Sequence, residues 1–153
     1  MNVSELEAKI AQRLRAAGLE SARWDAGVIN GHVLNQSREW LLAHDDDLVS
    51  SEDGQRVEEL ALRRAKREPL AYIIGYKEFY GRRFMVTSDV LIPRPESEVM
   101  IDMLSDVVVR GNTQTIGDTA KCNYSSRTYR LIDIGTGSGC LGITAKLERP
   151  ELN

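Results

Sequence analysis

The chain has 153 residues, of which 42% are hydrophobic and 28% are charged, and its formal net charge is -3 at pH 7. This mixture is typical of a folded globular protein and argues against wholesale disorder. The small negative charge excludes a global basic field, so tight sequence-independent binding to nucleic acid is not expected.

Residues 1–74 are predicted to form a small bundle of helices, either a partner-recognition module or a plain scaffold. Ser4 followed by Glu7 matches a capping box, and Gly18 is placed to end this first helix. Further helix starts are expected near Ser21, Ser37 and Ser50. The apolar stripes are Leu6, Ile10 and Leu14, then Trp24, Val28, Ile29 and Val33, then Trp40 and Leu41, and finally Val57, Leu60 and Ala61.

Residues 75–93 are predicted to be a β-hairpin linker. The run "EFYGRRFMV" places β-rich residues on both sides of Gly81-Arg82, which predicts a hairpin with a II′-type turn. "DVLIPRPESE" is expected to be extended, and Pro95 suits the start of a helix that continues to about Arg110. Residues 111–129 are polar and without a clean period, so they are expected to form a long loop.

The end of the predicted third region, residues 94–153, reads as a strand, a glycine loop and a helix. Leu131, Ile132 and Ile134 supply the expected strand, and an apolar helix follows the loop. This order is one half of a βαβ unit. Glycine lets such a loop bend sharply and lets a ligand approach bare backbone, while the helix start offers free N–H groups.

Two cofactor classes compete for this loop. Gly137-x-Gly139-x-x-Gly142 matches the dinucleotide fingerprint by letter. The glycine run begins earlier, however, at Gly135, and Asp133 precedes it. A carboxylate there would repel a pyrophosphate but suits a positively charged ligand such as S-adenosylmethionine. We therefore favour S-adenosylmethionine over a nicotinamide or flavin cofactor, or over a packing turn that binds nothing.

The cysteines and the apolar runs indicate in which cellular compartment the protein is expected. Cys122 and Cys140 have neither zinc-site nor disulfide-framework spacing, so we expect free thiols and no metal. The start of the sequence lacks the apolar core of a secretory signal, and no apolar run approaches the roughly 18 residues that cross a bilayer. A cytoplasmic protein is expected.

Three stretches resemble one known family. "REPLAYIIGYKEFYGRRFMVTSDVLIPRPESE" (Arg67–Glu98), "LIDIGTGSGCLGI" (Leu131–Ile143) and "WDAGVINGHVL" (Trp24–Leu34) are similar to HemK-type glutamine N5-methyltransferases, especially those that act on peptide chain release factors. Arg94-Pro95-Glu96 looks more like the release-factor branch than the ribosomal-protein branch, which stays an alternative.

The resemblance implies an α+β/α fold: an N-terminal helical bundle, a β-hairpin linker and the start of a Rossmann-like methyltransferase domain. It implies methyl transfer from S-adenosylmethionine to the glutamine of a release-factor Gly-Gly-Gln motif. The bundle would help dock the release factor, without direct contact to nucleic acid or membrane. Residues Pro93 to Glu96 would lie near the pocket entrance or simply turn the chain. The cofactor-binding residues implied are Asp133, Gly135, Thr136, Gly137, Ser138 and Gly139.

The family's catalytic Asn-Pro-Pro-Tyr does not occur in these 153 residues. We expect it, and the acid that follows the second strand, beyond Asn153, so no catalytic residue is assigned. The chain by itself is expected to be inactive, as a truncated product, a domain or a pseudogene fragment, and residues 130–153 to be poorly stabilised alone. A non-catalytic module that binds a release factor is the alternative.

Overall fold

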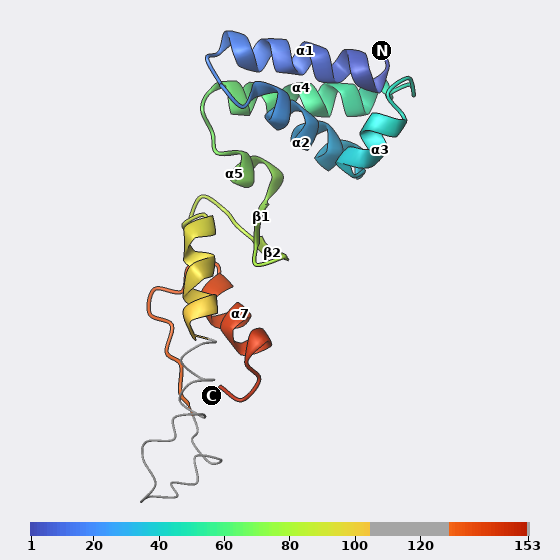
Figure 1. Cartoon of the computed structure of the whole chain (residues 1–153). Coiled ribbons are helices and arrows are strands. Elements are labelled where there is room, and N and C mark those ends of the chain that lie inside the picture. Colours follow the sequence, from blue (N-terminus) through green and yellow to red (C-terminus); the bar gives the residue numbers. More distant parts are fainter. Residues whose placement is uncertain (105–128, 153) are drawn as a thin grey trace, which may run out of the picture. The chain divides into compact units, whose positions relative to one another are not determined.

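The computed structural model describes residues 1–104 and 129–152. The chain divides into two compact units, Met1–Gly75 and Tyr76–Asn153. The first unit holds α1 (Val3–Ala16), α2 (Ala22–Leu34), α3 (Arg38–Ala43), α4 (Ser51–Ala65) and α5 (Leu70–Ile74) (Figure 1). The second holds β1 (Tyr76–Phe79), β2 (Arg82–Met85), the 3₁₀ turn η1 (Pro95–Ser97), helical residues 98–104 and α7 (Cys140–Glu148). The predicted helix end near Arg110 and most of the predicted loop 111–129 lie outside the described residues.

Helix α1 begins two residues earlier than the Ser4–Glu7 pattern predicts. Its cap is Asn2, whose side chain accepts the Glu5 N–H at 2.8 Å while the Glu5 carboxylate accepts the Asn2 N–H at 3.0 Å. The N–H of Ser4 donates to the carbonyl of Asp45, at 2.9 Å. The Ser4 prediction is therefore wrong, because Asn caps as well as Ser and a distant carbonyl satisfies the Ser4 amide.

The end of α1 confirms the role predicted for Gly18. Gly18 has a φ of +74° and its N–H donates to Arg15, while the N–H of Leu19 donates to the carbonyl of Leu14. These two hydrogen bonds form a Schellman motif, and the accompanying apolar contact joins Leu14 and Leu19 in the core.

The buried face of α2 differs from the prediction at Trp24. Trp24 is 58% exposed, and its ring lies 4.8 Å from the guanidinium of Arg38. The prediction is confirmed for Ile29, which is fully buried, and for Val33, which packs against the core. In place of Trp24, the small side chains of Ala22 and Ala26 are buried. Helical spacing alone does not distinguish these positions, and the small side chains let α2 lie against its neighbours.

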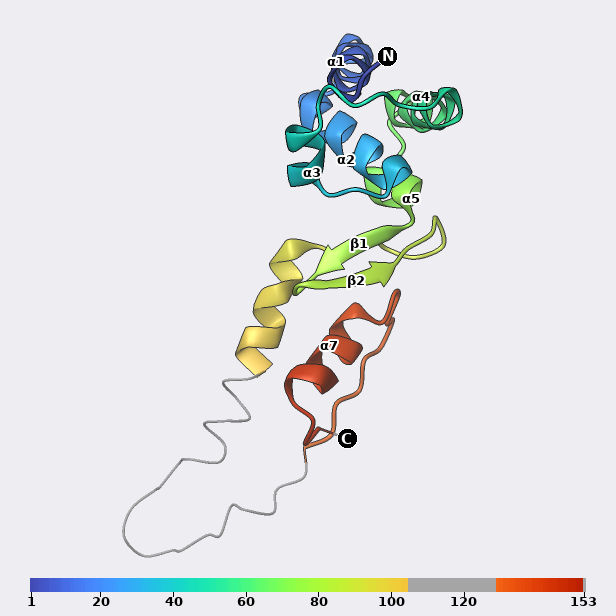
Figure 2. The same cartoon turned by 90° about the vertical axis from the view of Figure 1, so that its right-hand side faces the viewer.

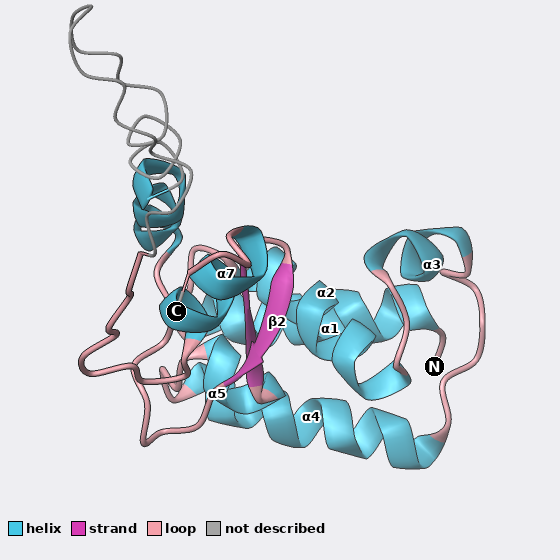
Figure 3. Cartoon of the chain, turned by 90° about the horizontal axis from the view of Figure 1, so that it is seen from below, coloured by secondary structure: helices cyan, strands magenta, loops and turns pink. Residues whose placement is uncertain are grey.

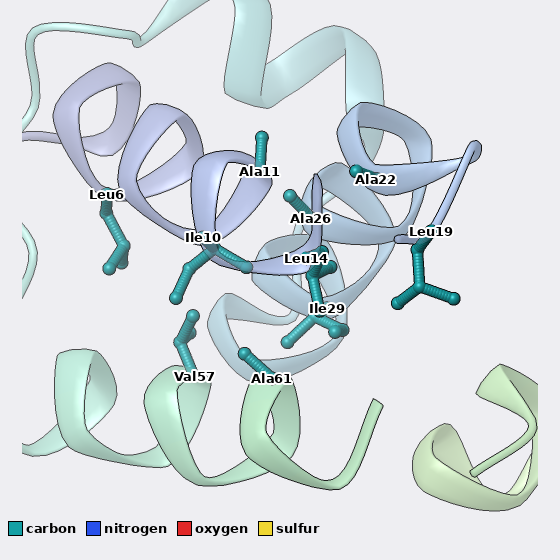
Figure 4. Close-up of a cluster of buried hydrophobic side chains, with 10 residues drawn as sticks. All are labelled: Leu6, Ile10, Ala11, Leu14, Leu19, Ala22, Ala26, Ile29, Val57 and Ala61. Carbon is teal, nitrogen blue, oxygen red and sulfur yellow. The ribbon is translucent and has the colours of Figure 1, made fainter. Parts of the chain in front are cut away.

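One hydrophobic core joins α1, α2 and α4 in the first unit. Side chains from α1 point toward Val57 and Ala61 on α4, with α2 alongside (Figure 4). Ser37 and Ser50 cap α3 and α4 as predicted, accepting the N–H groups of Trp40 and Asp53 at 3.2 and 3.0 Å. The members of the core are Leu6, Ile10, Ala11, Leu14, Leu19, Ala22, Ala26, Ile29, Val57 and Ala61.

The hairpin forms, but its turn is not the one predicted. Phe79 pairs with Arg82, which leaves Tyr80 and Gly81 as the two loop residues (Figure 2). Both have positive φ, 51° and 70°. Positive φ at both central residues is the mark of a type I′ turn, so the expected II′ turn at Gly81-Arg82 is wrong. No local pattern around Tyr80 predicts this conformation.

The second unit has its own apolar core, made by the hairpin and the helices. Phe79 and Phe84 meet edge to face, with ring centroids 6.2 Å apart, and pack with Ile101, Cys140 and Ala145. Pro95 begins η1, as its missing N–H predicts. Among the described residues, the sheet consists of β1 and β2 alone, both drawn as strands in Figure 3.

The predicted strand at 131–134 is not formed. Residues 131–133 have no regular structure, residues 134–135 form a turn, and Ile132 and Ile134 are 81% and 91% exposed. A strand exists only when a neighbour pairs with its backbone, and among the described residues nothing pairs with this segment. Within residues 1–104 and 129–152, no helix is long and apolar enough to cross a membrane.

Candidate cofactor site

The glycine loop has a backbone that other residues would resist. Gly135, Gly137 and Gly139 have φ values of +75°, +55° and +75°. This left-handed region strains residues that carry a Cβ. The Gly139 N–H closes the turn by donating to the carbonyl of Thr136 at 2.8 Å. The requirement for glycine inferred from the sequence therefore has a local cause in the backbone.

The loop is also open to a ligand. A Cβ added at Gly135 or Gly137 would meet no other heavy atom of the described chain within 4 Å. The hydroxyl oxygen of Ser138 is buried and has no hydrogen-bond partner among the described residues. Bare backbone beside an unsatisfied hydroxyl fits a polar ligand that presents its own donors and acceptors.

Asp133 lies at the start of α7, the helix that follows the loop. Its Oδ2 accepts the backbone N–H of Gly142 at 3.1 Å. The cap residue of α7 is Gly139, which has no side chain to do this. The carboxylate therefore satisfies one of the free N–H groups at the helix start and occupies its positive end. A pyrophosphate brought to this point would meet a negative charge.

Gly142 has a purpose that the sequence did not reveal. A Cβ at this position would lie 3.0 Å from the Asp133 Oδ2 and 3.3 Å from the Asp133 Cβ. Glycine therefore lets the carboxylate reach the helix backbone. The letter match to the dinucleotide fingerprint ended on this residue, whereas the structure gives it a packing role against Asp133. In a sequence, this contact would be indicated by an acid before the glycine loop together with a glycine in the first turn of the following helix.

A cavity of about 190 Å³ borders the same two residues. The rest of its lining is apolar and comes from helical residues 98–104, segment 131–132 and α7, including Ile101, Leu131 and Leu141.

The four residues from Pro93 to Glu96 differ in exposure: Pro93 is buried, whereas Arg94, Pro95 and Glu96 are exposed. Their placement at a pocket entrance stays a prediction.

Tyr80 is a residue that the sequence reasoning missed. Its hydroxyl donates to Oδ1 of Asp102 at 2.8 Å, and its backbone N–H donates to Oε1 of Glu98 at 2.8 Å. The hydrogen bond to Asp102, with further contributions from nearby carboxylates, raises the pKa of Tyr80. The hydroxyl therefore keeps its proton, and stays a hydrogen-bond donor, to a higher pH than a free tyrosine would.

Comparison with known proteins bears directly on the first unit. Residues 5–75 match the family model described as the PrmC N-terminal domain. The match ends at Gly75, the last residue of the first unit, so the PrmC N-terminal domain and the helical bundle coincide closely.

Whole-chain relatives extend the likeness to the glycine loop. The release factor glutamine methyltransferase of Nitratidesulfovibrio vulgaris is 39% identical over 142 residues, covering 93% of this chain and 43% of the relative. That of Aliivibrio fischeri is 32% identical over 153 residues, covering 100% of this chain and 48% of the relative. The bifunctional methyltransferase of Rickettsia prowazekii is 34% identical over 155 residues, covering 99% of this chain and 30% of the relative.

These matches confirm the resemblance to the N-terminal part of HemK-type methyltransferases that the three motifs indicated. The chain spans less than half the length of each of these curated relatives. What the relatives' names describe is the activity of proteins more than twice as long as the matched region.

Proposed function

We propose that this chain is the N-terminal part of an S-adenosylmethionine-dependent methyltransferase that acts on peptide chain release factors. The methyl group would pass to the side-chain amide of glutamine in a Gly-Gly-Gln motif. The observation that carries the cofactor assignment is the Asp133 carboxylate on the N-terminal end of α7. It disfavours a pyrophosphate and suits a ligand with a sulfonium and an ammonium group. The printed names of the relatives support the substrate.

Each loop residue has a distinct part in this proposal. The open backbone at Gly135, Thr136 and Gly137 would hold the methionine end of the cofactor, and the Ser138 hydroxyl would give it a hydrogen bond. Gly139 starts α7, and Asp133 fixes the loop against that helix. When bound, S-adenosylmethionine would supply an electrophilic methyl group. The chain's own residues would bind and orient it.

The proposal also covers the architecture and the partner. Residues 1–74 would be the bundle that helps dock the release factor, 75–93 the hairpin linker and 94–153 the first part of a Rossmann-like domain. The bundle has its own buried core, which suits a docking module. No direct contact with nucleic acid or membrane is required. Release factors act in translation, so the cytoplasm is the compartment for this activity.

Cofactor titration tests the proposal. Residues 1–153 would be joined to the part of the Nitratidesulfovibrio vulgaris relative that follows its matched region, giving a chimera with a complete domain. Calorimetry is expected to show saturable binding of S-adenosylmethionine and no binding of NAD⁺ or FAD, because Asp133 already occupies the helix start that a pyrophosphate needs. Binding of NAD⁺ in place of S-adenosylmethionine would contradict the cofactor assignment. The alternative is a non-catalytic module. It would be favoured if the chimera failed to methylate a release factor and the bundle pulled down the same amount of release factor with and without S-adenosylmethionine.

A further inference from the structure

Tyr80 occupies a backbone position that seldom holds a tyrosine. It is the first central residue of the hairpin turn, with a φ of 51°. Type I′ turns favour Asn, Asp or Gly at this place because a bulky side chain is strained there. A tyrosine kept at such a position calls for contacts that compensate the strain.

Two carboxylates one helical turn apart provide those contacts. Glu98 accepts the backbone N–H of Tyr80, and Asp102 accepts its hydroxyl, both at 2.8 Å. Positions four apart share one face of a helix, so both acids of helical residues 98–104 face the turn. The tip of the hairpin is thereby fixed to that helix by its main chain and its side chain together.

The same hairpin contacts α7 near both of its ends. Phe79 and Phe84 pack in one cluster with Cys140, the first residue of α7. At the other end, Arg82 Nη2 lies 2.7 Å from Oε1 of Glu148, the last residue of α7. The hairpin therefore links helical residues 98–104 to α7, as the arrangement in Figure 2 makes visible.

We infer that Tyr80 is a positioning residue for the glycine loop. It holds the hairpin tip on helical residues 98–104, and the hairpin in turn contacts α7. The glycine loop leads directly into the first turn of α7, and this turn contains Gly142, whose N–H binds Asp133. The geometry of the loop then depends on a residue more than fifty positions away in the sequence. This inference rests on the proposed function where it concerns S-adenosylmethionine, and on the described contacts alone where it concerns the loop.

Hydrogen exchange of the 153-residue chain, followed by mass spectrometry, tests it. Tyr80→Phe removes only the hydroxyl. We expect amides of helical residues 98–104 and of α7 to exchange about threefold faster, the scale of one exposed hydrogen bond, while α1 and α4 stay unchanged. Asp102→Ala should reproduce this effect, and adding it to Tyr80→Phe should cause no further change. Asp102→Asn keeps an acceptor and should restore most of the protection.

A second arm measures hydrogen exchange in the chimera, with and without Tyr80→Phe, as S-adenosylmethionine is added. The wild-type loop should gain protection, and Tyr80→Phe should need about threefold more cofactor for half of that gain. A purely structural effect would change the ligand-free exchange without moving this midpoint. Unchanged exchange in α7 of Tyr80→Phe, additive effects in the double variant or an unmoved midpoint would each overturn the inference. If wild-type protection never responds to S-adenosylmethionine, the cofactor assignment fails, while the ligand-free arm still reports whether Tyr80 holds α7.

Discussion

Replacing Arg64 with leucine is expected to lower the free energy of unfolding of the helical bundle by about 3 kcal/mol. Arg64 Nε lies 2.7 Å from Oδ2 of Asp25, whose residue is only 3% exposed. Without the guanidinium, the buried carboxylate keeps the Ser21 hydroxyl as its hydrogen-bond donor, at 2.9 Å. Leaving a buried charge without its opposite charge is far more costly than the pair itself is stabilising. Urea unfolding followed by circular dichroism measures the change.

The neighbouring residue supplies a matched control. Arg63 pairs with Glu68 near the end of the same helix, but with 45% of its side chain exposed. Arg63→Leu should change the unfolding free energy by no more than about 0.5 kcal/mol, because solvent screens an exposed pair. Arginine and leucine have similar helix propensities, so neither substitution should change the intrinsic stability of α4 appreciably. Equal losses for the two variants would refute the assigned role of the Asp25–Arg64 pair.

Replacing Asp133 with alanine is expected to weaken S-adenosylmethionine binding by the chimera about tenfold or more, the scale of one lost charge-assisted hydrogen bond. The substitution leaves the Gly142 N–H without its 3.1 Å partner and frees the loop from α7. Asp133→Asn should lie between wild type and Asp133→Ala, because an amide oxygen can accept the same N–H without the charge. Calorimetric titration of the three proteins gives the order.

An aspartate of the same unit serves as the control for charge alone. Asp89 is exposed, and its contacts are with Thr87 in the segment after β2. Asp89→Ala should leave the dissociation constant within about twofold, because exposed charges are screened by salt. Indistinguishable affinities for wild type and Asp133→Ala would show that the carboxylate does not hold the loop in its binding conformation.

Local patterns in the sequence predicted the features that local physics decides. Ser37, Ser50 and Gly18 mark helix ends because capping depends on a few consecutive residues. The need for glycine at Gly135 and Gly137 also follows from the loop itself, and both adopt positive φ. The helical bundle and the two-stranded hairpin could be read from periodicity and turn residues.

Features that depend on distant residues could not be read in this way. Asn2 caps α1 while the carbonyl of Asp45 accepts the Ser4 N–H, and Tyr80 has a positive φ beside Glu98 and Asp102. Trp24 matches the period of a buried stripe, but only packing shows that smaller side chains fill it. The strand expected at 131–134 requires a paired neighbour, which hydrophobicity alone does not supply.

Methylation of a release factor by the chimera is the decisive measurement for the proposed activity. The chimera would be incubated with S-adenosylmethionine carrying a heavy-isotope methyl group and with a purified release factor, and the peptide that contains Gly-Gly-Gln would be sequenced by tandem mass spectrometry. We expect one labelled methyl group on the glutamine side chain, and none when that glutamine is replaced or when residues 1–153 are supplied alone. A chimera that folds and binds S-adenosylmethionine but leaves the glutamine unlabelled, or that labels another residue instead, would contradict the proposed activity.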